Sequence, residues 1–397
     1  MHAASTSGGS SSYGTLVGSE TRDARGLVQD IVFGDAAQTR RSYTYNALTQ
    51  VTDVTTYRNP LSLWTTGTSP YTLPPALPSS TTQLTLEDYR FTYDVMGNLT
   101  LAEDWRTASE WPDTNRPVTR AWEYDSYFRL TRTTYTYAGS STWQAPFAPE
   151  NSNGDLLPRP APHISQSGRI TEETFAYDWL NNLVSNGDNG NAFYDRSIGT
   201  ATFGTSGKPH RMTASSNRST DSSRQGELAV AYDDVGQVTA MVIQRNGTCL
   251  PSGANCWTRF AYEWDEVGNL VRARRWDLTS GTERTTYGAS SSVNGAHPTR
   301  TPNAEMRYQY DGGSRVVKTS ARSEGTNYTA YAFSTLELRN TTLTGSGAAQ
   351  DYTLSSETTQ IRIGAGSVTG RVLHNATMPR TGTAQVHLFL EFGDHLG

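Results

Sequence analysis

Residues Phe91–Leu99 read Phe-Thr-Tyr-Asp-Val-Met-Gly-Asn-Leu, and seven copies of this stretch can be aligned along the chain. In every copy an aromatic residue precedes an Asp or Asn, and a Leu or Val follows five positions after that turn residue. In six copies a second aromatic residue stands two positions before the first. A repeat this regular sets the architecture, so it is interpreted before any single element.

The motif residues are Tyr45 and Asn46; Tyr93, Asp94, Gly97 and Leu99; Tyr124, Asp125 and Leu130; Tyr177, Asp178 and Leu183; Tyr232, Asp233, Gly236 and Val238; Trp264, Asp265, Gly268 and Leu270; and Tyr310, Asp311 and Val316. Their spacing is typical of a β-hairpin. Asp followed three residues later by Gly, or by Asn181, indicates a type I turn that ends in a left-handed residue. The Asp side chain can hold such a turn by accepting a backbone N–H two residues on. The register then predicts Tyr93 opposite Leu99.

Side chains of a strand alternate between its two faces, so Phe91 and Tyr93 share one face. Each hairpin therefore carries an aromatic stripe on one side. A single hairpin is marginally stable in water, and stacking hairpins edge to edge would make the stripe continuous. We predict an all-β fold of stacked antiparallel hairpins.

Composition excludes several classes. The chain has 397 residues, of which 35% are hydrophobic and 18% charged, and its mean hydropathy is −0.59. Its longest apolar runs, such as Val386–Phe392, are far shorter than the roughly 18 residues of a membrane-spanning helix. With a net charge of −5, no overall field draws the chain to nucleic acid. We expect neither a membrane span nor a nucleic-acid partner.

We predict two regions. Residues 1–39 form a polar N-terminal segment that could be partly ordered, and Met1–Gly9 has no apolar core of the kind that a signal peptide needs. Residues 40–397 form the hairpin array. Segments rich in Pro, Gly, Ser and Asn predict loop insertions at about 58–82, 140–168, 185–226, 246–258 and 280–304.

The aromatic-x-Tyr-Asp-x-x-Gly-x-Leu pattern resembles the tyrosine–aspartate (YD) repeat of the Rhs family. That family includes the C components of insecticidal Tc toxins and, more distantly, the teneurins. The phrase Gly207–Thr213 looks like a connecting phrase between Rhs repeats. The terminal phrase Asp394, His395, Leu396 and Gly397 looks like the one that precedes the family's core-associated region.

This resemblance implies a sheet that spirals into a hollow shell around a C-terminal toxin. It further implies a secreted or cell-surface bacterial protein whose partner is that toxin segment or the remaining shell polypeptide. The family's self-cleavage aspartates and its toxin lie beyond the terminal phrase, so neither activity is carried over to this chain. Seven repeats are also fewer than a closed shell needs. We expect a non-catalytic shell fragment.

Two alternatives stay open. An adhesion module could bind carbohydrate through exposed aromatic faces. A glycosidase could use paired acids such as Glu103 and Asp104, but neighbours on a strand point to opposite faces, and no cofactor or metal motif is present. Cys249 and Cys256 bracket a short turn-like segment and could form a disulfide or remain free thiols.

Overall fold

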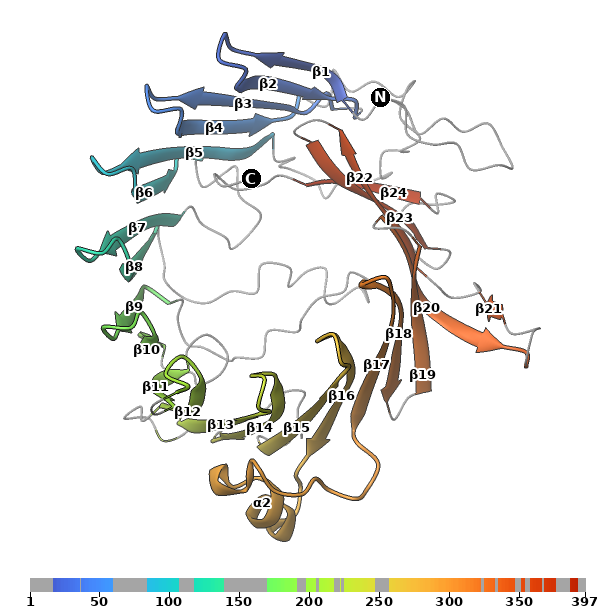
Figure 1. Ribbon diagram of the computed structural model, residues 1–397. Helices are drawn as coiled ribbons and strands as arrows, with labels where there is room; N and C mark the ends of the chain where they lie inside the picture. The colour runs from blue at the N-terminus through green and yellow to red at the C-terminus, as the bar shows by residue number, and fades with distance from the viewer. Residues whose placement is uncertain are drawn as a thin grey trace. The chain divides into compact units, whose positions relative to one another are not determined.

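The computed structural model describes residues 17–35, 37–59, 84–106, 118–138, 170–190, 198–204, 207–217, 222, 225–246, 257–322, 325–332, 335–346, 351–353, 358–365, 368–375 and 386–391. Almost all of these residues lie in antiparallel strands or in the turns between them (Figure 1). The predicted all-β fold of antiparallel hairpins is confirmed.

The chain divides into two compact units, and the boundary passes through β7 and β8. In the first unit each strand from β1 to β7 pairs with its neighbour in the chain, as do β22 to β24. Its strands are β1 (Val17–Arg22), β2 (Val28–Phe33), β3 (Arg40–Tyr45), β4 (Val51–Tyr57), β5 (Thr85–Tyr93), β6 (Leu99–Asp104), β7 (Val118–Tyr124), β22 (Thr358–Ala365), β23 (Val368–Asn375) and β24 (Val386–Glu391).

The second unit follows the same rule from β9 to β21. Its strands are β8 (Leu130–Tyr137), β9 (Glu172–Tyr177), β10 (Leu183–Asp188), β11 (Gly199–Phe203), β12 (Met212–Asn217), β13 (Gly226–Tyr232), β14 (Val238–Arg245), β15 (Trp257–Trp264), β16 (Leu270–Asp277), β17 (Ala304–Asp311), β18 (Ser314–Arg322), β19 (Gly325–Ala332), β20 (Leu336–Thr344) and β21 (Asp351–Thr353).

The aromatic stripe exists in both units. Neighbouring rings on one face of a strand are nearly parallel and about 6 Å apart, a favourable spacing for aromatic pairs. The stacked pairs are Tyr43 with Tyr45 (6.4 Å), Tyr89 with Phe91 (6.1 Å) and Phe260 with Tyr262 (6.4 Å).

The region boundaries differ from the prediction in three places. Within the described residues the sheet already includes Val17–Arg22, so it is not limited to residues 40–397. The segment 185–226, predicted as a loop, contains the strand pair β11–β12. The segment 280–304, also predicted as a loop, contains the helix α2 (Gly281–Tyr287) and the 3₁₀ turn η4 (Ser290–Ser292). The predicted insertions at 58–82, 140–168 and 246–258 lie largely outside the described residues.

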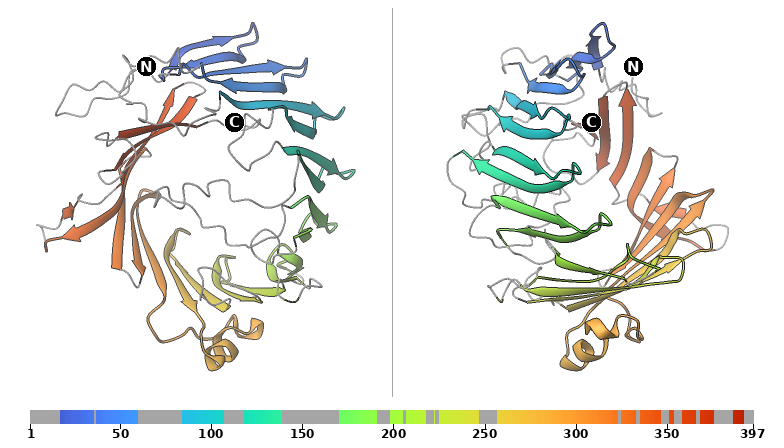
Figure 2. Two further views of the ribbon diagram at one scale, coloured as in Figure 1. Left: turned by 180° about the vertical axis from the view of Figure 1, so that it is seen from behind. Right: turned by 60° about the vertical axis from the view of Figure 1, so that its left-hand side comes forward.

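The α2–η4 segment covers one face of the strands β13 to β16 (Figure 2). Four small side chains on β13 and β14 form a buried cluster with Val293, which follows η4; they are Ala229, Ala231, Ala240 and Val242. Alanine lets the segment approach the sheet closely. The opposite face of the same strands holds a second cluster around Leu228, Val230 and Ile243, which includes the half-buried Tyr232.

Arg259 on β15 fixes this segment to the sheet. Its side chain is fully buried, with 0% exposure. The guanidinium donates five hydrogen bonds of 2.8–3.0 Å, to the carbonyls of Tyr287, Ser292, Val293 and Gly295 and to Nδ1 of His297. None of these acceptors is a carboxylate. Backbone dipoles and one imidazole thus replace water around the buried charge, which makes Arg259 the centre of this packing.

His297 makes the segment sensitive to acid. Burial, and then the charges of Arg259 and Arg274, hold the pKa of His297 below its ordinary 6.5, while Glu263 acts in the opposite direction. The unfolded chain therefore takes up this proton before the folded chain does. The stability that neutral His297 contributes is present above pH 6.5 and is lost as the pH falls through the lower folded-state pKa.

We expect the urea concentration at the unfolding midpoint of the second unit to decrease when the pH is lowered from 7 to 5. In His297→Asn the side-chain oxygen still offers Arg259 an acceptor and does not titrate, so this part of the pH dependence should vanish. Denaturation followed by tryptophan fluorescence at several pH values measures it, since Trp276 stacks on His297 at 5.6 Å. An unchanged slope in His297→Asn would contradict the assignment.

Candidate functional site: a ladder of hairpin turns

The turn of hairpin β5–β6 shows how the motif works. The Asp94 N–H donates to the Asn98 carbonyl at 2.9 Å, and the Gly97 N–H donates to the Asp94 carbonyl at 3.1 Å. Oδ1 of Asp94 accepts the N–H groups of Met96 and Asn98 at 2.9 and 2.8 Å. Gly97 has a φ of +91°, the left-handed conformation that glycine adopts without strain. The Asp side chain thus holds the turn.

Six of the seven predicted turns share this geometry. In each, the N–H of the turn residue donates to the carbonyl four positions on, and its side-chain oxygen accepts backbone N–H groups; the turn residues are Asn46, Asp94, Asp125, Asp178, Asp233 and Asp265. The left-handed position holds Gly in three turns and Asn181 in a fourth. In the other two it holds Thr49 and Phe128, with φ of +66° and +60°, at a cost of about 1 kcal/mol each.

The strand register next to these turns brings the motif aromatic opposite the motif aliphatic residue. The observed pairs are Tyr45 with Val51, Tyr93 with Leu99, Tyr177 with Leu183, Tyr232 with Val238, and Trp264 with Leu270. Tyr124 ends β7 and Leu130 begins β8, on either side of the Asp125 turn. Tyr93 therefore pairs with Leu99 as the spacing predicts.

The seventh copy departs from the prediction. Tyr310 pairs with Arg315 rather than with Val316, and Asp311 pairs with Ser314. The two residues between them, Gly312 and Gly313, have φ of +54° and +85°. Two consecutive left-handed residues form a tight two-residue turn, which glycine permits at both positions. The turn is one residue shorter, so Val316 loses its predicted place.

One turn of this type was not predicted. In hairpin β1–β2 the Asp23 N–H donates to the Leu27 carbonyl at 2.8 Å, and Gly26 has a φ of +84°. Arg22 stands where the other hairpins carry an aromatic residue, which hides the copy from a search for Tyr-Asp. The spacing of Asp23, Gly26 and Val28 still matches the turn motif, and it is the sequence signal from which this hairpin could have been predicted.

Motif aromatics also join hairpins to the hairpin that precedes them. Five of them donate their single polar hydrogen to a backbone carbonyl of the preceding hairpin, at 2.6–2.9 Å. The pairs are Tyr45 to Val28, Tyr93 to Val51, Tyr232 to Met212, Trp264 to Val238, and Tyr310 to Leu270. Except for Met212, each acceptor lies five positions after its own turn residue. We call this set of bonds, with the turn contacts below, the turn ladder.

A second set of contacts joins the turns themselves. The residue four positions after a turn residue reaches forward to the next turn: Gln50 Nε2 donates to the Gly97 carbonyl at 3.0 Å, and Arg129 Nη1 donates to the Asp178 carbonyl at 3.1 Å. The phrase Gly207–Thr213 continues this series. Its Pro209 carbonyl accepts from Asn182 at 3.1 Å, and its Arg211 donates to the Asp233 carbonyl at 3.0 Å.

Hydrogen bonding sets the charge state of the turn residues. The Asn98 side-chain amide, with backbone N–H groups, lowers the pKa of Asp94, and Asn269 does the same for the pKa of Asp265. Burial raises the pKa of Tyr93 and of Tyr232 above the usual value for tyrosine. The carboxylates thus stay charged acceptors and the phenols stay neutral donors near pH 7. In these charge states both kinds of group form the hydrogen bonds described above.

The tips of these turns carry apolar side chains. All but one of the large hydrophobic side chains exposed among the described residues lie at turn tips; they are Leu48, Val95, Met96, Tyr127, Phe128, Trp179, Val235 and Val267, with Trp105 as the exception. Val95 and Trp179 are the most exposed, at 96% and 87%.

Several predicted residues cannot be placed. The terminal phrase Asp394–Gly397 and both cysteines, Cys249 and Cys256, lie outside the described residues. In the part of the chain that the structure describes, no group of three His, Cys, Asp or Glu side chains is close enough to hold a metal ion. No helix within those ranges is long and apolar enough to cross a membrane.

No protein-family model matches the chain, and no curated protein matches it in sequence. Among solved structures, the chain is similar in fold to components of Tc toxins. One is a Photorhabdus luminescens Tc holotoxin pore with a mutated TccC3, at 16% identity and a TM-score of 0.45, over 96% of this chain and 14% of that chain. The other is a TcdB2–TccC3 complex, at 14% identity and a TM-score of 0.41, over 94% and 17%. The chain thus spans less than a fifth of either.

Removing one ladder bond tests the ladder directly. Tyr93→Phe deletes the hydroxyl that donates to the Val51 carbonyl and keeps the ring, so we expect a loss of about 1 kcal/mol in the free energy of unfolding. Tyr127→Phe is the matched control, since Tyr127 lies at a turn tip and is 74% exposed. Urea titrations of both variants make the comparison. Equal stabilities would show that the bond contributes nothing.

Proposed function

We propose that the chain is a non-catalytic wall segment of an Rhs-type shell, which shields a polypeptide carried by the same toxin-type protein outside the producing cell. The observation that carries the proposal is the turn ladder. Five motif aromatics have their polar atom bonded to the backbone of the preceding hairpin. Side chains fixed in this way stiffen a continuous wall. They are not available to bind a ligand.

The turn carboxylates support the same proposal. In five turns an Asp carboxylate accepts backbone N–H groups of its own turn, and in the sixth the amide oxygen of Asn46 does so. A general acid or base needs a lone pair or a proton directed at a substrate. These oxygens are directed into the turns, so the repeat contributes structure rather than chemistry.

A carbohydrate-binding adhesion module is the second candidate. It rests on Trp179 and Tyr127, whose side chains at the turn tips are 87% and 74% exposed. Exposed rings of this kind offer a flat apolar face beside a polar edge. In this alternative the tips bind the sugar, and the ladder only supports them.

Shielding can be tested with a fusion. We would attach an unstructured reporter polypeptide after Gly397 and follow its digestion by a protease at low dose. The wall proposal expects the reporter to survive longer in this fusion than when attached to a double variant, Tyr93→Ala with Tyr232→Ala, whose ladder is broken in both units. Equal digestion rates would overturn it. Glycan binding that disappears in Trp179→Ala, with the fold intact, would favour adhesion.

A further inference from the structure

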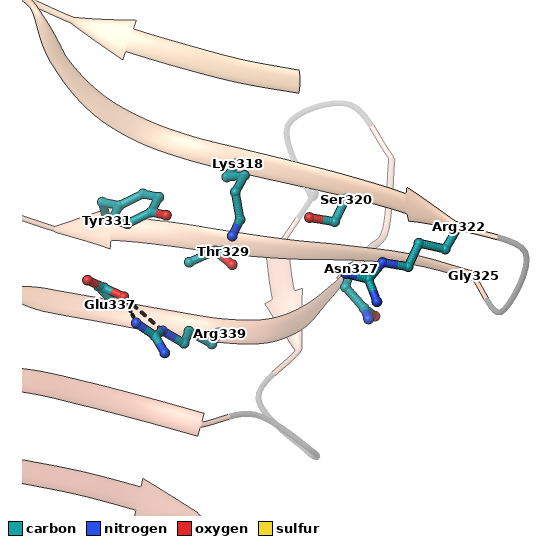
Figure 3. A pocket seen from close by; sticks show the side chains of 9 residues that line it. All are labelled: Lys318, Ser320, Arg322, Gly325, Asn327, Thr329, Tyr331, Glu337 and Arg339. Atoms are coloured by element: carbon teal, nitrogen blue, oxygen red, sulfur yellow. Dashed lines mark hydrogen bonds and ion pairs between the residues drawn. The ribbon is translucent and has the colours of Figure 1, made fainter. Parts of the chain in front are cut away.

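A concave pocket lies on one face of the strands β18, β19 and β20 (Figure 3). Its volume is about 500 Å³. The strand register places Lys318 opposite Thr329 and Ser320 opposite Asn327. Side chains of alternate residues on three adjacent strands therefore line one continuous surface. They are Lys318, Ser320 and Arg322 on β18; Gly325, Asn327, Thr329 and Tyr331 on β19; and Glu337 and Arg339 on β20.

The pocket has an excess of positive charge. Three cationic side chains line it, Lys318, Arg322 and Arg339, against one acid, Glu337. Glu337 is already committed, because it forms an ion pair of 2.6 Å with Arg339. Figure 3 shows Lys318 extending from β18 across β19 toward Thr329, and Arg322 extending toward Asn327. Two cations thus point into the pocket without a carboxylate of their own among its lining residues.

The surroundings of Lys318 point the same way. The side chain is half-buried, and burial, followed by the positive charges of Arg339 and Arg315, lowers the pKa of Lys318, while the charge of Glu337 acts in the opposite direction without reversing the shift. A cation held among other cations is electrostatically unfavourable in the empty pocket. A bound anion would remove that penalty, and its gain would be larger than at an exposed lysine because the site is partly shielded from water.

We propose that this pocket binds an acidic sugar, a small polyhydroxylated ligand that carries one carboxylate, sulfate or phosphate group. The oxyanion would lie between Lys318 and Arg322. Hydroxyl and amide groups of Ser320, Asn327 and Thr329 would bind the hydroxyls of the sugar, and the Tyr331 ring would bound one side. A volume of about 500 Å³ is in the range of small-molecule sites and far exceeds a bare oxyanion. The site is separate from the turn ladder and does not depend on the proposed shell.

Calorimetric titration at low salt would measure binding of three probes to the full chain: glucuronate, glucose and inorganic phosphate. We expect glucuronate to bind, glucose not to bind, and phosphate to bind more weakly than glucuronate. Added salt should weaken the binding of glucuronate, since the site is open to solvent on one side. No binding of glucuronate would overturn the proposal, and equal binding of phosphate would overturn its sugar component.

The chain offers a matched pair of variants, because Lys318 and Lys208 are its only lysines. Lys318→Met should weaken glucuronate binding about tenfold, the effect of removing one close charge at a partly shielded site. Lys208→Met makes the same chemical change at an exposed turn residue and should leave the affinity unchanged. Glu337→Gln removes the only acid in the pocket and should tighten binding several-fold. Equal losses in the two lysine variants would overturn the site.

Lysine labelling gives a second readout that does not rely on affinity. An amine-reactive acetylating reagent near pH 8 should modify Lys318, whose pKa is lowered, and the peptide map has only one other lysine to compare. Saturating glucuronate should slow acetylation of Lys318 and leave that of Lys208 unchanged. Equal protection of both lysines, or of neither, would contradict binding at this pocket.

Discussion

Replacing Arg259 by Ala should lower the free energy of unfolding of the second unit by about 3–5 kcal/mol, because several acceptors around the guanidinium lose their donor together, at about 1–3 kcal/mol for each one left unsatisfied. The substitution removes all five donors at once. It takes the arginine donors away from four backbone carbonyls and from Nδ1 of His297, and of these acceptors the Ser292 carbonyl keeps a second donor, the Gly295 N–H at 2.8 Å. Unsatisfied buried acceptors each carry a desolvation penalty, so their costs accumulate.

The test is urea denaturation of Arg259→Ala beside two controls. Arg259→Lys keeps the charge but offers one compact ammonium, which cannot reach five acceptors spread over residues 287–297, so it should recover little of the loss. Arg275→Ala removes a half-exposed arginine from the neighbouring strand and should change the stability by less than about 0.5 kcal/mol. Hydrogen exchange should also show residues 281–297 opening early in Arg259→Ala. A variant as stable as Arg275→Ala would exclude this role for Arg259.

Tyr232→Ala is the second large effect that we expect, a loss of about 2–3 kcal/mol. The half-buried ring packs against the cluster of Leu228, Val230 and Ile243, and its hydroxyl donates to the Met212 carbonyl at 2.8 Å. The variant therefore creates a gap in the cluster and breaks one bond of the turn ladder. Large-to-small changes in a packed cluster combine lost burial with a cavity term.

Two further variants separate these contributions. Tyr232→Phe keeps the ring and should lose only about 1 kcal/mol, the value of one hydrogen bond. Val235→Ala changes a turn-tip side chain that is 79% exposed and should be close to neutral. If Tyr232→Ala were no less stable than Tyr232→Phe, the ring would not be part of the cluster. Adhesion through exposed aromatics would then gain support.

Much of the fold follows from local sequence. An Asp followed by Gly or Asn three residues later determines a turn through bonds within five residues, so the Asp94 and Asp178 turns could be read directly. The seventh hairpin was misread because Gly312 and Gly313 together permit a shorter turn than the motif implies. The hairpin β1–β2 was missed because its turn depends on Asp23 and Gly26, while the aromatic residue used as a search key is dispensable to the turn.

The contacts between hairpins could not be predicted from the sequence. Which carbonyl accepts from Tyr93 depends on how β4 lies against β5, and that register joins residues 28 to 37 positions apart in the chain. The same limit applies to Arg259, whose β-strand neighbours gave no sign of a buried cation. The α2–η4 segment was predicted as a loop because Gly, Ser, Asn and Pro are frequent in residues 280–304. A serine cap and packing on the sheet stabilise it instead.

The turn ladder determines where the sequence of such a chain can accept insertions during evolution. Ladder bonds join turn to turn and strand to strand, whereas the long connection between β4 and β5 leaves the sheet at the opposite strand ends. There the Arg58 N–H donates to the Leu84 carbonyl at 2.8 Å and closes the base of that connection. Sequence inserted beyond this bond leaves every rung in place. Turn residues of successive copies, counted from Asp23, can therefore stand anywhere from 23 to 55 residues apart, and a longer connection does not require any change in the hydrogen bonds between the hairpins.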